Sequence, residues 1–206
     1  MDNKGSLVVV SGFSGAGKGT LMKALLSRYD NYALSISATT RKPREGEEDG
    51  REYFFKTTDE FEQMMAGDEL VEYAQYVGNY YGTPKDYVFS NIESGKDVLL
   101  EIEIQGALKI KEKFPEAVLL FITPPSTAEL KTRLIKRGTE SLDIINARLK
   151  RASEEAEGIE NYDFILINDR VDICVEEMHE LIQTMRKRIN NHLSFIRAIR
   201  EEMQTI

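Results

Sequence analysis

The chain has 206 residues, of which 41% are hydrophobic and 30% charged, a composition typical of one compact globular domain with a small insertion. Its 27 Lys and Arg residues stand against 35 Asp and Glu residues, and the net charge of −8 argues against a nucleic-acid-binding surface, so any anion site must be a local cluster. The single cysteine, Cys174, excludes a disulfide framework, and without a stretch of roughly 20 apolar residues to span a bilayer we expect a cytoplasmic protein with no membrane contact.

The first predicted strand is the β-branched run at 7–10, which breaks at once into the glycine-rich text SGFSGAGKGT. The text LMKALLSRY at 21–29 then has helical spacing. Apolar runs like the first recur at 97–102, 117–122 and 162–167, with helical segments between them. Continuous apolar runs suit strands buried on both faces, so this alternation predicts an α/β fold with a parallel sheet core flanked by helices.

Residues 35–83 interrupt this alternation. The segment is rich in tyrosine and contains short strand-like pieces, and Thr57 with Glu60 has the spacing of a capping box before the helical text TDEFEQMMAG. We therefore predict a small separate module of mixed structure, inserted between strands of the core sheet.

Residues 126–157 form a second interruption. Their patterning is helical, opens on another capping box at Ser126 and Glu129, and is broken by the text RGTES. The segment concentrates positive charge in Arg133, Arg137, Arg148 and Arg151. Taken singly, each of these arginines is best explained as a solvated charge on a helix.

The tail, residues 171–206, contains neither Gly nor Pro. Its apolar residues recur at spacings of three and four, namely Met178, Ile182, Met185, Ile189, Leu193 and Ile196. This spacing predicts one long amphipathic helix, which offers a surface for a homo-oligomer.

The text GFSGAGKGT follows the first strand and opens a helix, which is where a phosphate-binding loop must lie. Glycines let successive backbone N–H groups surround a phosphate, the helix N-terminus adds partial positive charge, and Lys18 reaches the β and γ oxygens. The strict pattern has Ser or Thr directly after the lysine as a Mg²⁺ ligand; here Gly19 takes that place, and Thr20 follows as a possible ligand. We predict a nucleoside triphosphate site formed by Gly12, Phe13, Ser14, Gly15, Ala16, Gly17, Lys18, Gly19 and Thr20.

Further motifs follow this loop in the order SISATTRKPREGEEDGREYFF, VEYAQYVGNYYGT, EIEIQGA, ITPPS, RLIKRGTES, NARL and ILIND. Together they resemble the guanylate kinase family over nearly the whole chain. The resemblance implies the fold of a P-loop nucleoside monophosphate kinase and Mg²⁺-dependent phosphoryl transfer from ATP to GMP. It divides the chain into a core (1–34, 84–125 and 158–206), a GMP-binding module (35–83) and a helical lid (126–157).

The acceptor site follows from the chemistry of GMP. A monophosphate carries about two negative charges and needs arginines in fork geometry, which Arg41 and Arg44 provide. The resemblance gives Glu72 the guanine N–H donors and gives the hydroxyls of Ser37 and Thr83 its carbonyl. The full set implied for GMP is Ser37, Arg41, Arg44, Tyr53, Glu72, Tyr81, Gly82, Thr83 and Glu103.

Two carboxylates in EIEIQGA raise an open question. The resemblance gives Glu101 a water on Mg²⁺ and makes Glu103 a guanine contact, although the family commonly has Asp at the second place. One extra methylene moves that carboxylate, so we expect its contact to differ from that of Asp or to run through water. The alternative is a pair of strand-end carboxylates that face solvent.

For the donor, the resemblance places Arg133, Arg137 and Arg148 on a lid that closes over ATP, and Asn168 near adenine. Catalysis is then assigned to Lys18, Arg41, Arg137 and Arg148, which align the phosphates and neutralise their charge.

Two other functions remain open from the sequence. One is a catalytically inactive guanylate-kinase-like module that binds phosphorylated peptides, against which an intact Lys18 counts. The other is a kinase for another phosphorylated small molecule, which would be expected to lack the 35–83 insert.

Overall fold

The computed structural model describes residues 4–76, 78–136 and 142–205. In these residues a five-stranded sheet has the order β2-β7-β1-β8-β9, and all of its neighbouring strands are parallel. Its strands are β1 (Leu7–Gly12), β2 (Tyr32–Leu34), β7 (Asp97–Glu101), β8 (Val118–Thr123) and β9 (Phe164–Ile167). Its helices are α1 (Lys18–Arg28), α3 (Lys85–Glu93), α4 (Ile104–Lys113) and α7 (Val171–Met185). The predicted α/β fold with a parallel sheet is confirmed.

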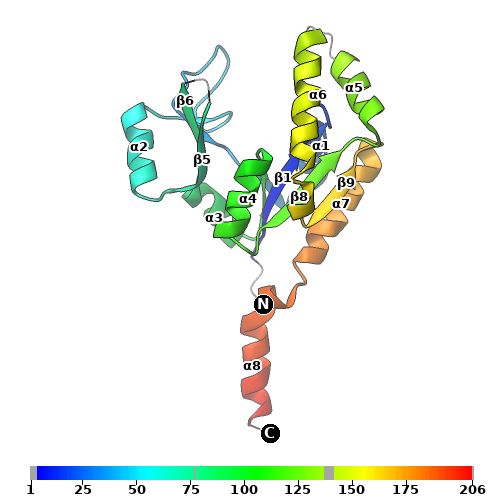
Figure 1. The fold of residues 1–206 in the computed structure, drawn as a ribbon. Helices are drawn as coiled ribbons and strands as arrows, with labels where there is room; N and C mark the ends of the chain where they lie inside the picture. The colour runs from blue at the N-terminus through cyan, green and yellow to red at the C-terminus, as the bar shows by residue number, and fades with distance from the viewer. Residues whose placement is uncertain (1–3, 77, 137–141, 206) are drawn as a thin grey trace.

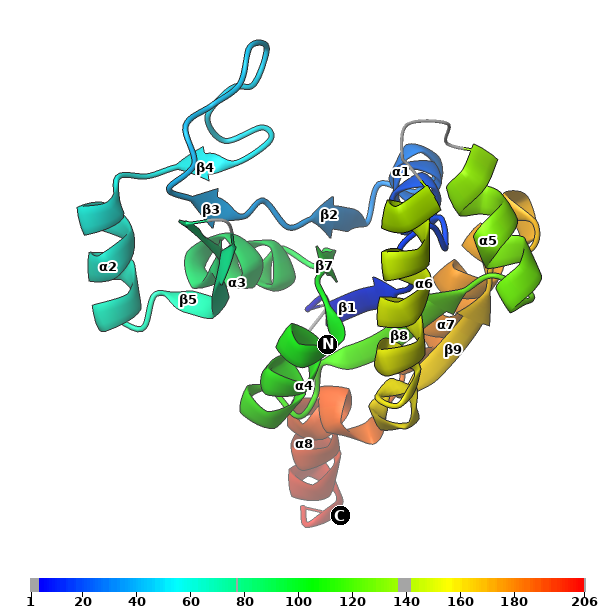
Figure 2. The ribbon, with the colours of Figure 1, turned by 45° about the horizontal axis from the view of Figure 1, so that its top comes forward.

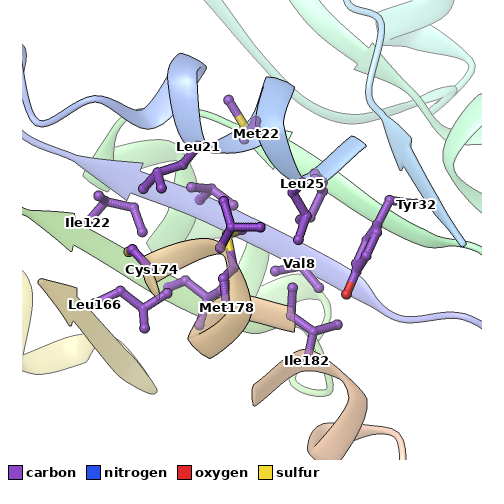
Figure 3. Close-up of a cluster of buried hydrophobic side chains, with 14 of the residues drawn as sticks. Val8, Leu21, Met22, Leu25, Tyr32, Ile122, Leu166, Cys174, Met178 and Ile182 are labelled. Atoms are coloured by element: carbon purple, nitrogen blue, oxygen red, sulfur yellow. The ribbon is translucent and has the colours of Figure 1, made fainter. Parts of the chain in front are cut away.

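Alternating residues of the central strands enter two cores, one on each face of the sheet. Val8 and Val10 of β1 pack on the face covered by α1 and α7, whereas Val9 packs on the face that carries α4. Figure 3 shows side chains of both helices gathered over β1, namely Leu21, Leu25, Met178 and Ile182 around Val8. Cys174 is buried in the same cluster.

The edge strands depart from what the sequence predicts. The three-residue β2 was not predicted, because a run this short has no periodicity of its own and exists through its pairing with β7. The prediction that β9 is buried on both faces is wrong, because Ile165 is 53% exposed and Ile167 is 56% exposed. Only one face of this edge strand is covered, where Leu166 meets the α7 cluster.

Residues 35–83 contain a second, four-stranded sheet of mixed direction, with the order β4-β3-β6-β5. Its elements are β3 (Ala38–Thr39), β4 (Phe54–Phe55), α2 (Thr58–Ala66), β5 (Leu70–Tyr76) and β6 (Asn79–Pro84). The predicted capping box is confirmed, because Glu60 N–H donates to the Thr57 hydroxyl and Thr57 N–H donates to the Glu60 carboxylate. Figures 1 and 2 show this unit standing to one side of the core sheet.

Residues 126–157 stand on the opposite side and form α5 (Thr127–Lys136) and α6 (Leu142–Ala156) (Figures 1 and 2). The two helices pack through a small apolar cluster that also receives Phe13 from the phosphate loop. The second predicted capping box is half formed. Glu129 N–H donates to Ser126 Oγ, as a capping box requires, but the Glu129 carboxylate accepts from Arg133 instead of completing the box. The text RGTES lies outside the described residues. Whether this segment and 35–83 act as separate domains stays a prediction.

The prediction of one continuous tail helix is wrong. Helix α7 ends at Met185, a 3-10 turn, η2, covers Ile189–His192, and α8 (Leu193–Met203) begins afterwards. Asn191 Nδ2 donates to the carbonyl oxygens of Met185 and Arg186 at 3.1 and 3.4 Å, so a side chain takes the groups that a continuing helix would bond. Helix α8 therefore leaves the base of the body as a separate arm (Figure 1). None of the described helices has both the length and the hydrophobicity to cross a bilayer.

Phe121 of β8 contacts Phe13 of the phosphate loop, so its substitution tests the packing between the sheet and that loop. It is fully buried, and its ring meets Phe13 at 5.0 Å and Tyr162 at 5.3 Å between centroids, both edge-on. Phe121→Ala should lower the free energy of unfolding by about 3–5 kcal/mol, because it leaves a cavity. Ile165→Ala removes the exposed cross-strand partner of Phe121 and should cost under about 1 kcal/mol. Urea unfolding measures both, and equal losses would contradict this view of the core.

Candidate active site

The turn between β1 and α1 has the curled backbone that a phosphate-binding loop needs. Gly15 and Gly17 have φ angles of +94° and +93°, in the left-handed region that favours glycine. A Cβ atom on Gly17 would lie 2.5 Å from Nδ2 of Asn168, and one on Gly15 would lie 2.9 Å from a methyl group of Leu134. The described loop therefore fits glycine at both positions, whereas Gly19 has open space around it.

Lys18 lies across this loop. Its Nζ donates to the carbonyl oxygens of Gly12 at 2.7 Å and Phe13 at 3.4 Å, and it lies 3.9 Å from the Glu101 carboxylate. Its side chain is mostly buried, whereas Glu101 is partly exposed at the end of β7. The ammonium group is thus held against the loop, on the wall of a cavity of about 650 Å³.

Arg133 and Asn168 support the loop from outside. Asn168 Nδ2 donates to the carbonyl oxygen of Ala16 at 2.8 Å, and Arg133 donates to the carbonyl oxygens of Asn168 at 2.8 Å and Ala16 at 3.4 Å. Asn168 is buried, and within the described residues its Oδ1 has no hydrogen-bond partner. Both side chains were predicted to contact ATP; that role stays a prediction, and the structure gives them a contact with the loop itself.

Two arginines of α6 reach the same cavity. Arg148 donates to Ser14 Oγ of the loop at 2.5 Å, and Arg151 donates to the Glu103 carboxylate at 2.5 Å. The sequence assigned Arg148 to the lid but gave Arg151 no role, because its partner is 48 positions away along the chain. Arg137 lies outside the described residues.

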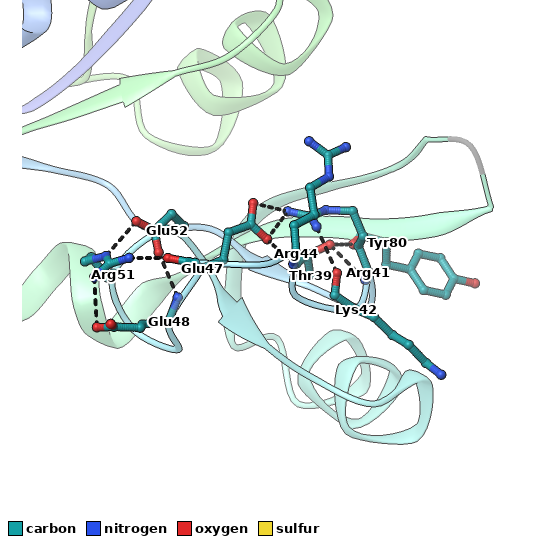
Figure 4. Close-up of polar contacts among 10 residues, drawn as sticks. Thr39, Arg41, Lys42, Arg44, Glu47, Glu48, Arg51, Glu52 and Tyr80 are labelled. Atoms are coloured by element: carbon teal, nitrogen blue, oxygen red, sulfur yellow. Dashed lines mark hydrogen bonds and ion pairs between the residues drawn. The ribbon is translucent and has the colours of Figure 1, made fainter.

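Arg41 forms the centre of a charged cluster in residues 35–83 (Figure 4). Its Nη2 donates to both oxygens of Glu47 at 2.9 Å, and its guanidinium lies 5.2 Å from the centre of the Tyr53 ring. Glu47 also accepts from the backbone N–H of Arg44 at 2.7 Å. The hydrogen bond from Arg41 holds the pKa of Glu47 below its usual range, so this carboxylate is a fixed negative charge. The sequence analysis did not select Glu47, which lies in an acidic run that looks like a solvated loop.

Two tyrosines, Tyr53 and Tyr81, lie beside Arg41 in this charged cluster. The rings of Tyr53 and Tyr81 meet edge-on with 6.0 Å between their centroids, and Tyr53 lines the cavity that also contains Lys18. The guanidinium of Arg41, which packs over Tyr53, is therefore near the cavity, while the side chain of Arg44 is exposed.

Three of the predicted guanine-reading residues lie close together in the small sheet, with Glu72 on β5, Thr83 on β6 and Ser37 just before β3, whereas Glu103 lies at the start of α4. The Thr83 hydroxyl donates to Glu72 Oε1 at 2.7 Å across β6 and β5. The register pairs Ala38 with Gly82, so Ser37 is next to Thr83 on the neighbouring strand. Burial raises the pKa of Glu72, and the hydrogen bond from Thr83 reduces that rise. A Cβ on Gly82 would approach the carbonyl oxygen of Glu72 to 3.0 Å, so Gly82 allows these strands to pack closely.

The residues present fit a magnesium ion that arrives with a nucleotide. Thr20 is exposed in the first turn of α1, and Glu101 supplies a carboxylate beside Lys18. Within the described residues no three or more His, Cys, Asp or Glu side chains gather in a way that could hold a metal. One hydroxyl and one carboxylate suit Mg²⁺, which keeps water and phosphate oxygens as most of its ligands.

Comparison with known proteins gives a consistent result. The sequence model of the guanylate kinase family matches residues 4–185. Guanylate kinase from Caldanaerobacter subterraneus is 51% identical over 199 residues, which is 97% of each chain. Guanylate kinase from Bacillus subtilis is 50% identical over 88% of this chain and 90% of the relative. The solved guanylate kinase of Anaplasma phagocytophilum has a TM-score of 0.68 at 31% identity, and the match covers 90% of this chain and 88% of that one.

The Arg41–Glu47 pair gives a testable prediction. Glu47→Gln should weaken GMP binding about tenfold, because one of the two oxygens that accept from Arg41 Nη2 becomes an amide group that cannot accept and the negative charge is lost. Glu48→Gln is the matched control, since Glu48 lies on the same loop but pairs with Arg51. Calorimetric titration measures both affinities. Tighter binding by Glu47→Gln would show instead that Glu47 competes with the ligand for Arg41.

Proposed function

The chain belongs to the guanylate kinase family and transfers a phosphoryl group from ATP to GMP, and we propose the following division of that work among its residues. One observation carries the proposal: a single cavity is lined by Ser14 and Lys18 of the loop, by Tyr53 of the 35–83 unit and by Arg148 of α6. The residues that we assign to the donor, the acceptor and the lid thus line one space, which supports a direct transfer between two bound nucleotides.

Lys18 and Arg148 serve the donor. The backbone N–H groups of the loop surround the β-phosphate, and Lys18 exchanges its carbonyl partners for phosphate oxygens. Arg148, which already touches Ser14, neutralises charge on the transferred group. Phosphoryl transfer needs little covalent chemistry from the protein, so these cations act mainly by alignment and by stabilising charge. Thr20 and Glu101 would hold Mg²⁺, which when bound supplies further charge neutralisation on the β and γ oxygens.

Arg41 and its neighbours serve the acceptor. The guanidinium of Arg41, oriented by Glu47, binds the GMP phosphate together with Arg44 and the hydroxyls of Tyr53 and Tyr81. Glu47 fixes the fork before GMP arrives, so less side-chain freedom is lost on binding.

Glu72 reads the base. As a carboxylate it accepts from the N1 and N2 donors of guanine. Ser37 offers its hydroxyl to the carbonyl, and Thr83 does so by releasing the hydrogen bond that it donates to Glu72. Adenine would leave these groups, of which Thr83 is buried and the other two are half-buried, without partners, and such mismatches can reject a base by about 10⁴–10⁵-fold. A cytoplasmic location is proposed as well, supported by the single buried Cys174.

Acceptor choice tests the function directly. In a coupled assay of ADP release, ATP should give turnover with GMP and at least about 10³-fold less with AMP, CMP or UMP. Lys18→Ala should lower kcat by about 10²-fold or more with the fold intact, whereas Lys23→Ala, an exposed lysine on the same helix, should not. Equal turnover of AMP would refute the acceptor assignment, and normal kcat in Lys18→Ala would refute the role of Lys18.

The raised pKa of Glu72 allows a second test, which asks whether this carboxylate binds guanine. Protonation removes its ability to accept both guanine donors, so KM for GMP should rise as pH falls, starting above the pH at which an ordinary glutamate titrates. The GMP phosphate also titrates, near pH 6, and would mask the effect. Glu72→Gln retains that phosphate step but loses the carboxyl step. Superimposable pH profiles of the two enzymes, scaled to their KM at neutral pH, would exclude Glu72 from the guanine site.

A further inference from the structure

Ser11 stands directly before the phosphate loop, at the end of β1, and the reaction described above gives it no role. Its side chain is buried, at 1% exposure, and its Oγ donates to the carbonyl oxygen of Ile102 at 2.7 Å. Ile102 is the residue between Glu101, which we assign to Mg²⁺, and Glu103, which we expect to contact guanine. One hydrogen bond therefore joins the donor loop to the short segment that carries both carboxylates.

This bond lies where the sheet stops holding the two segments together. β1 and β7 pair in parallel register, and their last pair is Val10 with Glu101. Beyond that point Ser11 still pairs with β8, whereas residues 102–103 leave the sheet toward α4. Ser11 thus extends the contact between β1 and the end of β7 by one step, with a side-chain hydroxyl as the donor in place of a backbone N–H.

The other polar contacts of this segment are made by groups nearer to solvent. Glu101 lies 3.9 Å from Lys18 Nζ, and its own side chain is partly exposed. Glu103 pairs with Arg151, and both of these side chains are exposed, so water weakens their attraction. Of these three contacts, the one from Ser11 is made by the most buried side chain.

The Ser11 hydroxyl lies in a closed environment. Its cross-strand neighbour on β8 is Phe121, which is fully buried and whose ring meets the Tyr162 ring at 5.3 Å between centroids. Loss of the hydroxyl would vacate the space of one oxygen atom, which is too small to admit a water molecule in its place. The carbonyl oxygen of Ile102 would then lose this partner, and the segment would shift to find another.

We propose that Ser11 is a positioning residue for phosphoryl transfer, whose hydroxyl holds Ile102, and with it both flanking carboxylates, in place relative to the phosphate loop. The inference rests on the roles proposed for Glu101 and Glu103. Ser11 itself touches neither nucleotide. It acts on geometry, and a misplacement of about 1 Å among reacting groups can slow a reaction by about 100-fold.

Ser11→Ala removes the hydrogen bond with little change in size, and steady-state kinetics measures the result. The variant should lower kcat about tenfold at saturating ATP, GMP and Mg²⁺. The Mg²⁺ concentration that gives half the maximal rate should rise at least about threefold, because Glu101 is displaced. The preference for GMP over IMP, as a ratio of kcat/KM values, should fall at least about threefold, because IMP lacks the exocyclic amine that Glu103 would accept from. Ser11→Thr keeps a hydroxyl and should retain both values.

Val9→Ala is the matched control for lost stability. Val9 is fully buried and lies two residues before Ser11, so both side chains point to the same face of β1. Its truncation weakens the core without removing the bond to Ile102. Urea unfolding should show that Val9→Ala and Ser11→Ala are both folded, and Val9→Ala should keep the wild-type Mg²⁺ requirement and the wild-type preference for GMP.

Glu103→Ala separates the inference from the role on which it rests, since it should lower the preference for GMP by itself. An unchanged preference in Glu103→Ala would refute the guanine contact, and the inference with it. If Glu103→Ala lowers the preference while Ser11→Ala keeps both wild-type values, the contact stands and the inference about Ser11 is overturned. Changes of the same size in Val9→Ala, or in a folded Ser11→Thr, would overturn it too, because the hydroxyl would then not be their cause.

Discussion

The structure depends on one constraint. The central strand β1 is buried on both faces, and the loop that follows it must curl tightly so that the loop's own backbone N–H groups face the cavity. β1 lies in the middle of a parallel sheet, so the carboxyl ends of its neighbours meet at the same edge. Glu101 at the end of β7 and Asn168 just after β9 reach the loop for this reason. Gly15 and Gly17 then let Leu134 and Asn168 approach the backbone. The site is therefore a product of sheet topology as much as of the motif.

The two accessory units use different physics to bring charge to that edge. In residues 35–83, Arg41 is already paired with Glu47 and packed over Tyr53, so its guanidinium is held by charge and aromatic contact. In residues 126–157, α5 and α6 share an apolar cluster with Phe13, which holds this helix pair against the loop. The first arrangement fixes a guanidinium, and the second fixes the position of a helix pair.

Much of this fold could be predicted from the sequence, because local patterns determine it. Four strands and the capping box at Thr57 follow from runs and spacings within a few residues. What could not be predicted depends on distant partners. β2 exists only by pairing with β7, Ile165 is exposed because no further strand covers the edge, and Asn191 ends α7 by a side-chain bond. In the site, Glu47 and Arg151 are identified only by the groups they contact.

The ion pair between Glu103 and Arg151 has a consequence for how the two substrates affect each other. Glu103 is expected to contact guanine, yet it is held by Arg151 of helix α6. An exposed pair of this kind contributes no more than about 1 kcal/mol, so GMP would displace Arg151 at small cost. Binding linkage is reciprocal: if GMP frees α6 to move, a lid position fixed by ATP must change GMP affinity by the same factor, about fivefold at most. One surface carboxylate thereby couples the two binding equilibria by a factor that is the same whichever nucleotide binds first.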